Sequence, residues 1–129
     1  MESRVVARFR DGRIMKGTTT NFSPTRGLFH LTGAQGKTVE ISLGELKAVF
    51  FVKTFEGNPG YTEKRQFDLA RMYGRKVCCT FPDGEVLTGY TQGFAPDRQG
   101  FFVIPSDPQS NNERVFVVNG PDVRVELNR

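Results

Sequence analysis

The 129-residue chain contains no tryptophan, two cysteines and one histidine. A structural zinc site usually needs four Cys or His ligands, so the chain has no ligand set for one, and we expect no metal and no cofactor. No apolar run approaches the ~20 residues of a membrane-spanning helix, and the first residues lack the apolar core of a signal peptide. We therefore expect a cytoplasmic protein with no membrane partner.

The two cysteines, Cys78 and Cys79, are adjacent. Neighbouring side chains of a strand point to opposite faces of the sheet, which disfavours an ordinary disulfide between them. We expect reduced cysteines that serve as packing residues, with a redox-active vicinal pair as the alternative.

Residues suited to catalysis are sparse. His30 is the single histidine, and the chain contains no Gly-x-Ser-x-Gly sequence. Asp11 and Asp83 each precede a glycine and are expected in turns, and no Ser-His-Asp arrangement is recognisable. We therefore expect that the protein is not an enzyme.

The chain does contain an internal repeat. Six residues recur 72 positions later: Phe9, Asp11, Gly12, Gly17, Phe22 and Pro24 return as Phe81, Asp83, Gly84, Gly89, Phe94 and Pro96. After a one-residue insertion at Gln99, Gly27 and Phe29 return as Gly100 and Phe102. A repeat of this kind predicts two similar structural units, and units of about 50 residues are expected to pack together because each is marginal alone.

Each unit has the pattern of a small β structure. Twelve phenylalanines and short alternating apolar runs between turn residues indicate an all-β protein. Asp-Gly pairs predict tight hairpins, and Gly17 and Gly89, inside the predicted return strands, predict sharp bends. The predicted strands of the first unit are 4–10, 14–20, 27–31, 39–43 and 48–52. In the second unit, a first strand before the Asp-Gly pair is followed by predicted strands at 86–91, 100–104, 114–118 and 123–127.

The repeat divides the chain into a first unit of residues 1–53, a linker of residues 54–74 and a second unit of residues 75–129. Thr62 is a candidate N-cap for a short helix that reaches Tyr73, because this stretch lacks Gly and Pro. An extended linker pinned by Phe67 is the alternative.

The spacing Asp-Gly-Arg, three residues, Gly, four residues, Phe resembles the first motif of Sm-like proteins, and both units keep it. The segment Val115-Phe-Val-Val-Asn-Gly-Pro-Asp-Val-Arg-Val is similar to their second motif. The resemblance implies two tandem Sm-like or SH3-like five-stranded barrels. The whole chain also resembles an uncharacterised bacterial family of about this length, to which no activity is attached.

The residues with which Sm-like proteins hold a nucleobase are replaced in both units. The Asp after the motif phenylalanine is Ser23 or Ala95, and the turn that carries their Arg-Gly pair reads Leu-Gly-Glu-Leu or Asn119-Gly120. The position of their Asn falls at or beside Gly27 in the first unit and at Gln99 or Gly100 in the second. The resemblance therefore implies the fold without the base-binding pocket.

A basic face is the best candidate site. Residues 1–53 carry nine Lys and Arg against four Asp and Glu, whereas residues 75–129 carry six against seven. Arg4, Arg8 and Arg10 alternate along the first strand, and Arg13 and Lys16 extend the patch beyond the turn. Such a face could bind phosphates, or its charges could keep a solvated edge strand from aggregating.

The sequence thus predicts a non-enzymatic binding or adaptor protein, with another protein as the expected partner. RNA or single-stranded DNA on the basic face is the first alternative. The second is cyclic di-GMP sensing, because Arg4-x-x-x-Arg8 and Asn21-x-Ser23 resemble motifs of PilZ barrels, although the glycine at Gly27 comes one residue late. The oligomeric state is left open.

Overall fold

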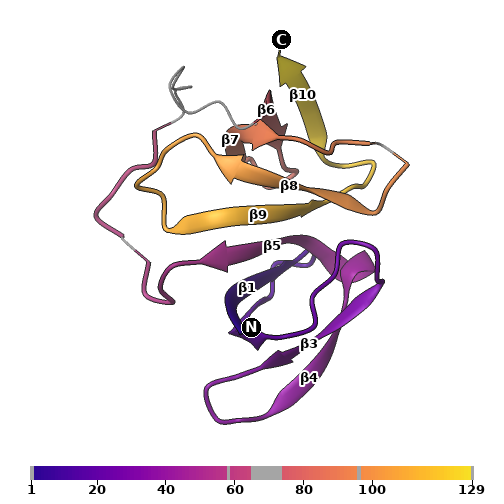
Figure 1. Ribbon diagram of the computed structural model, residues 1–129, viewed down its shortest axis with the longest axis vertical. Coiled ribbons are helices and arrows are strands. Elements are labelled where there is room, and N and C mark those ends of the chain that lie inside the picture. The colour runs from indigo at the N-terminus through magenta and orange to yellow at the C-terminus, as the bar shows by residue number, and fades with distance from the viewer. Residues whose placement is uncertain (1, 58, 65–73, 96, 129) are drawn as a thin grey trace.

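The computed structural model describes residues 2–57, 59–64, 74–95 and 97–128, and in these residues the chain forms one continuous antiparallel sheet (Figure 1). The all-β prediction is confirmed. The first five strands are β1 (Ser3–Phe9), β2 (Ile14–Thr19), β3 (Leu28–Thr32), β4 (Thr38–Ser42) and β5 (Leu46–Val52). The last five are β6 (Arg75–Thr80), β7 (Val86–Thr91), β8 (Gly100–Pro105), β9 (Asn112–Val118) and β10 (Arg124–Asn128). Between β4 and β5 lies a short 3-10 helix, η1 (Leu43–Glu45).

No helix in the described part of the chain is long and apolar enough to cross a bilayer. Of the helix predicted over residues 62–73, residues 62–64 have no regular secondary structure. The rest of that prediction, Phe67 included, lies outside the described residues.

Two tight turns join β1 to β2 and β6 to β7. Gly12 and Gly84 adopt φ angles of +94° and +89°, a region that glycine enters without steric strain. The carboxylates of Asp11 and Asp83 each accept a hydrogen bond of 3.0 Å from the backbone N–H two residues on. The prediction of Asp-Gly turns at both positions is confirmed.

The strand order is the same in both halves of the chain. The sheet runs β10-β6-β7-β8-β9-β5-β1-β2-β3-β4, so the fifth strand of each half pairs with the first strand of that half. The halves are joined where β5 pairs with β9, from Ala48 opposite Val117 to Phe51 opposite Arg114. Figure 1 shows these two strands side by side across the middle of the molecule. The outer edges of the sheet are therefore β4 and β10.

The buried apolar side chains form two clusters. Side chains alternate between the faces of β5, so Val49 and Phe51 enter the first cluster while Ala48 and Phe50 enter the second. The first cluster contains Val5, Ala7, Phe9, Phe29, Leu31, Ile41, Leu43, Leu46, Val49, Phe51, Phe116 and Val118. The second contains Val6, Ala48, Phe50, Val52, Val77, Cys79, Phe81, Leu87, Phe101, Val103, Val115 and Val117.

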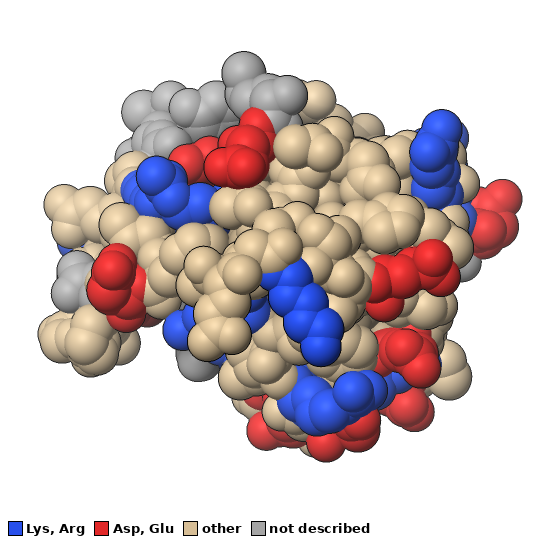
Figure 2. Space-filling model, turned by 90° about the horizontal axis from the view of Figure 1, so that it is seen from below, with Lys and Arg blue, Asp and Glu red and all other residues tan. Residues whose placement is uncertain are grey.

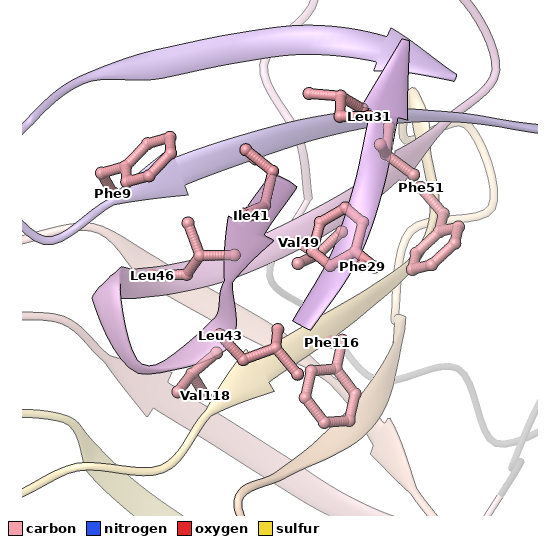
Figure 3. Close-up of a cluster of buried hydrophobic side chains, with 12 residues drawn as sticks. Phe9, Phe29, Leu31, Ile41, Leu43, Leu46, Val49, Phe51, Phe116 and Val118 are labelled. Carbon is pink, nitrogen blue, oxygen red and sulfur yellow. The ribbon is translucent and has the colours of Figure 1, made fainter. Parts of the chain in front are cut away.

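Each cluster uses side chains from both halves. Phe116 and Val118 of β9 lie among the side chains of the N-terminal strands in the first cluster (Figure 3). Conversely, Val6 of β1 and Phe50 of β5 belong to the second cluster. Neither half therefore encloses its apolar core without the other.

Gly17 and Gly89 allow two strands to approach β2 and β7 closely. A Cβ atom at Gly17 would lie 2.4 Å from the carbonyl oxygen of Thr32, and one at Gly89 would lie 2.1 Å from that of Ile104. Real Cβ atoms do not approach backbone atoms this closely. The two predicted bend positions are thus places where only glycine fits.

The structure corrects the alignment of the repeat. Thr32 and Ile104 occupy matching places, 72 positions apart, over the two bend glycines. The residue of the second repeat that corresponds to Phe29 is therefore Phe101, which is buried in the second cluster. The predicted correspondence of Phe29 with Phe102, across an insertion at Gln99, is wrong. Phe29 pairs with Ile41 and Phe101 with Val117. The extra residues consequently lie in the longer loop between β8 and β9.

That longer loop is organised by Asp107, which is 4% exposed. Its carboxylate accepts hydrogen bonds from the Tyr61 hydroxyl, from the backbone N–H of Lys64 at 2.8 Å and from that of Gln109 at 2.9 Å. Burial opposes ionisation of Asp107, but these hydrogen bonds outweigh burial and lower its pKa. The loop is therefore a built structural element that also holds part of the linker.

The two cysteines are free thiols. Cys79 is fully buried in the second cluster, and burial, together with the neighbouring Cys78, raises its pKa to about 12. A thiol with such a pKa stays protonated and is a poor nucleophile. Cys79 is thus a packing residue, as predicted.

Replacement of Gly89 by alanine is expected to lower the free energy of unfolding by ~2 kcal/mol, because the new methyl group forces β7 and β8 apart. Urea denaturation at pH 7 measures the change. Gly93→Ala adds the same methyl group where no atom lies within 4 Å and φ is not positive, and it should be nearly neutral. Equal effects of the two substitutions would contradict the close approach.

Candidate binding site at the junction of the two halves

A pocket of about 270 Å³ lies beside the junction of β5 and β9. The two copies of the repeated Phe-x-Asp-Gly turn converge on it from the two halves of the chain. The remaining walls come from the start of β5, the end of β9 and the segment that leads into β10. The lining residues are Phe9, Arg10, Gly12, Leu46, Lys47, Phe81, Pro82, Asp83, Val118, Gly120, Asp122 and Val123.

The floor of the pocket is apolar. Phe9 and Phe81 occupy the same position in the two repeats, and both are at least 95% buried. Leu46 and Val118 complete the floor, and both belong to the first cluster. Since Phe81 belongs to the second cluster, the pocket opens at the seam between the two apolar cores.

An ion pair crosses this seam at the pocket wall. The ammonium group of Lys47, whose side chain is only 9% exposed, lies 2.7 Å from the Asp83 carboxylate and also contacts the Glu85 carboxylate. The same ammonium lies 4.5 Å from the centre of the Phe81 ring. The hydrogen bond from Lys47 is the main cause that lowers the pKa of Asp83. The second Asp-Gly turn is thereby held against β5 of the first half.

The rim carries one further charge of each sign. The guanidinium of Arg10 donates hydrogen bonds to the carbonyl oxygens of Leu46 at 3.2 Å and Asn119 at 3.5 Å. These bonds orient the guanidinium but leave its charge without a carboxylate partner in the described part of the chain. Asp122 also lines the pocket and is exposed, and no ion pair holds its carboxylate among the described residues. The pocket therefore presents a cation and an anion above an apolar floor.

Three of the five predicted basic residues bind within the first half or the linker. Arg4 donates to the carbonyl oxygen of Lys53 at 3.0 Å, and Lys16 donates to that of Phe55 at 3.2 Å. Arg13 pairs with Asp11 at 2.8 Å, beyond the first turn. Arg4 and Lys16 thus both bind the segment that follows β5, whereas Arg13 binds within its own turn.

Arg8 and Arg10 are built into the junction instead. Arg8 is partly buried, and its guanidinium lies 5.1 Å from the centre of the Phe50 ring, in the second cluster. Its Nε is buried and has no hydrogen-bond partner within the described residues. Of the five, only Arg10 lines the junction pocket. The face seen in Figure 2 carries groups of Lys and Arg beside groups of Asp and Glu.

Two residues of the cyclic di-GMP hypothesis, Asn21 and Ser23, are engaged in local contacts. The Asn21 side chain contacts the His30 ring at 2.9 Å and accepts a hydrogen bond from the His30 backbone N–H at 3.0 Å. Ser23 hydrogen-bonds to Thr25 at 3.1 Å. These contacts connect β2 to β3, and binding of the dinucleotide stays a prediction.

The groups considered for catalysis are held apart. Asp11 and Asp83 serve the two turns, and His30 lies exposed on β3, 3.8 Å from Glu40. Within the described residues, no three His, Cys, Asp or Glu side chains lie close enough together to hold a metal ion.

Sequence reasoning missed the junction pocket. The sequence assigns Phe9 and Gly12 to one hairpin and Asp83 to another. Lys47 and Asp83, whose ion pair joins the two halves, are 36 positions apart, and no local sequence pattern links them. The repeat was the available signal for the pocket. When two similar units pack together, their equivalent Asp-Gly turns can come close to each other in space.

Removal of the Lys47 charge is expected to destabilise the protein in a pH-dependent way. A carboxyl group with a lowered folded-state pKa stabilises the fold above its ordinary pKa near 3.8, and this stabilisation is lost as the pH falls through the folded-state pKa. Lys47→Met should therefore lower the free energy of unfolding by about 1 kcal/mol at pH 7 and by less at pH 2.5. Urea denaturation at both pH values measures the difference.

The control for Lys47→Met is Lys37→Met, which removes an exposed ammonium from the loop between β3 and β4. Its effect should be small at both pH values. A constant loss of stability in Lys47→Met from pH 7 to pH 2.5 would show that the ion pair does not contribute.

Nucleic-acid binding by the basic residues is testable on the three that lie outside the junction. Combined replacement of Arg4, Arg13 and Lys16 by alanine removes three cationic groups without disturbing Arg8 or Arg10. If they bind phosphates of a single strand, the slope of log affinity against log salt should fall in magnitude by about 2. Fluorescence anisotropy with a labelled RNA measures it, and an unchanged slope or no binding by the wild type would remove the hypothesis.

No curated protein and no solved structure matches the chain. A model of a family of unknown function, DUF6982, matches residues 1–124. This match fits the resemblance to an uncharacterised family. The chain therefore belongs to DUF6982, a family of unknown function.

Proposed function

We propose that the protein is a non-enzymatic binding module that holds a segment of another protein in the junction pocket. The observation that carries the proposal is the composition of that pocket, an apolar floor of Phe9, Leu46, Phe81 and Val118 below a rim of both charge signs. An apolar anchor buried in a pocket and surrounded by polar contacts is the usual arrangement at the centre of a protein interface.

The size of the pocket suits a large side chain of a peptide. Small-molecule and cofactor sites occupy about 300–1,000 Å³, and this pocket, of about 270 Å³, is close to the lower end of that range. A single aromatic or large aliphatic side chain would fill much of it. The guanidinium of Arg10 and the carboxylate of Asp122 are then available to carbonyl, carboxylate or cationic groups that flank the anchor.

We further propose that the two halves are Sm-like or SH3-like small barrels, with residues 1–53 and 75–129 as the two units and residues 54–74 as the linker. The common strand order, the presence of two apolar clusters and the matching bend glycines support this assignment. Small barrels often bind extended segments at loops or sheet edges. The junction pocket would then be a feature of the tandem arrangement rather than of either barrel.

The proposal is tested by selecting peptides that bind the wild type and comparing their binding to a variant whose pocket is blocked. Peptides are selected on the wild type, and their dissociation constants are measured for the wild type and for Pro82→Trp. Pro82 is an exposed pocket residue at a turn position that Arg10 occupies in the first repeat, so the turn accepts a residue other than proline. We expect at least about a tenfold loss of affinity, as at interface hot spots.

The matched control is Ile14→Trp, which adds the same side chain at an exposed position outside the pocket. It should leave the affinity unchanged. Thermal unfolding of both variants checks that the fold is intact. Selected peptides that bind Pro82→Trp as tightly as the wild type would place the binding surface elsewhere.

A further inference from the structure

β10 is an open edge of the sheet. One side of the strand pairs with β6 through Arg124 opposite Thr80 to Asn128 opposite Lys76. No strand of the described residues pairs with its other side. An edge strand presents a row of unpaired backbone donors and acceptors, which is a template for another strand.

The side chains of this edge alternate between two kinds. Val123, Val125 and Leu127 are partly exposed and pack against the second cluster. Arg124 and Glu126 lie on the other face, with 77% and 54% of their side chains exposed. They form an ion pair of 3.2 Å with each other along the strand. The edge therefore has an apolar face and a face with one charge of each sign.

The side chains of β10 argue against one kind of sheet extension, in which β10 would pair with a strand of another copy as β5 pairs with β9. β10 pairs with β6 as β5 pairs with β1, which makes Arg124 and Glu126 the counterparts of Ala48 and Phe50. Ala48 and Phe50 enter the apolar cluster of the opposite half. Two charged side chains at these positions could not do so, because burial of unpaired charges is unfavourable. Pairing of β10 with β4 of another copy at the equivalent register is thereby disfavoured.

We propose that β10 pairs with β10 of a second copy of this chain, antiparallel and around a two-fold axis at Val125. In such an interface each residue faces its symmetry counterpart. Arg124 of one copy then lies opposite Glu126 of the other, and Glu126 lies opposite Arg124. The sequence of the strand is thus self-complementary in charge at this register.

The apolar face is complementary at the same register. Val125 lies opposite Val125 of the second copy, and Val123 lies opposite Leu127. Directly opposed side chains of an antiparallel pair have Cβ atoms about 5 Å apart, so apolar and oppositely charged pairs both stabilise the contact. The dimer covers the partly exposed apolar residues that pack against the second cluster. The two ion pairs within the strands, one in each copy, are replaced by two ion pairs between the copies.

The other edge lacks this complementarity. Glu40 is the only charged residue of β4, so a β4 pair has no positive strand residue to oppose it. A single five-residue strand buries little surface, and the association through β10 is weak and depends on protein concentration. The proposal is independent of what the junction pocket binds.

The test is a charge exchange measured by sedimentation equilibrium over a series of concentrations. Arg124→Glu and Glu126→Arg each place like charges opposite one another, and each should weaken the wild-type dimer at least about tenfold. The double variant, Arg124→Glu with Glu126→Arg, restores both cross-strand pairs and should dimerise as the wild type does. An equal mixture of the two single variants should form a heterodimer.

The heterodimer is the sharpest outcome, because each single variant alone serves as its control. Glu40→Lys on β4 is the matched control for a charge reversal at the other edge, and it should leave the dimer unchanged. Circular dichroism checks that the variants stay folded. A wild type that stays monomeric, single variants that dimerise like the wild type, a mixture that does not associate, or a dimer weakened by Glu40→Lys would each overturn the proposal.

Discussion

The pairing of β5 with β9 is the interaction on which the rest of the structure depends. A strand at the edge of a sheet has one paired side, and in a small sheet it usually buries one face. Here both strands are paired on both sides and bury both faces, with Val49 and Phe116 directed into one cluster and Ala48 and Val117 into the other. The same backbone ladder therefore joins the two halves and completes both cores.

The elements of the fold were predictable because their signals are local. The Asp-Gly turns depend on a positive φ that glycine adopts, and Gly17 and Gly89 depend on one close contact each. Alternation over five to seven residues placed the strands within a few positions of their observed bounds. The repeat then predicted the same order of elements in both halves.

The junction was not predictable in the same way, because alternation does not say how many faces of a strand are buried. The first strand was expected to have one buried face, with Arg8 and Arg10 in solvent opposite Val5. In the structure Val6 belongs to the second cluster and Arg8 lies against Phe50. A long arginine stem covers apolar surface well, so Arg8 packs against Phe50 at a position that alternation alone assigns to solvent.

The ion pair of Lys47 has a role that an apolar side chain at its position would not fill. An apolar residue packed against Phe81 would stabilise the seam between the clusters without specifying which part of the second half lies there. A poorly exposed ammonium group is strongly disfavoured unless a carboxylate reaches it, so Lys47 tolerates only arrangements that bring Asp83 and Glu85 to β5. The ion pair thus favours the arrangement in which the second Asp-Gly turn lies against β5.

The outer edges differ from the inner junction at equivalent positions, so neither edge can repeat the contact by which β5 meets β9. Phe29 pairs with Ile41 as Phe101 pairs with Val117, so Glu40 of β4 is the counterpart of Phe116 of β9. Phe116 is fully buried between the halves, whereas Glu40 is exposed. At the junction the two repeats carry apolar residues that require a neighbour, and at the outer edges they carry charges that tolerate water. The two copies of the repeat therefore differ where one unit must meet the other and where the outer edges do not repeat that contact.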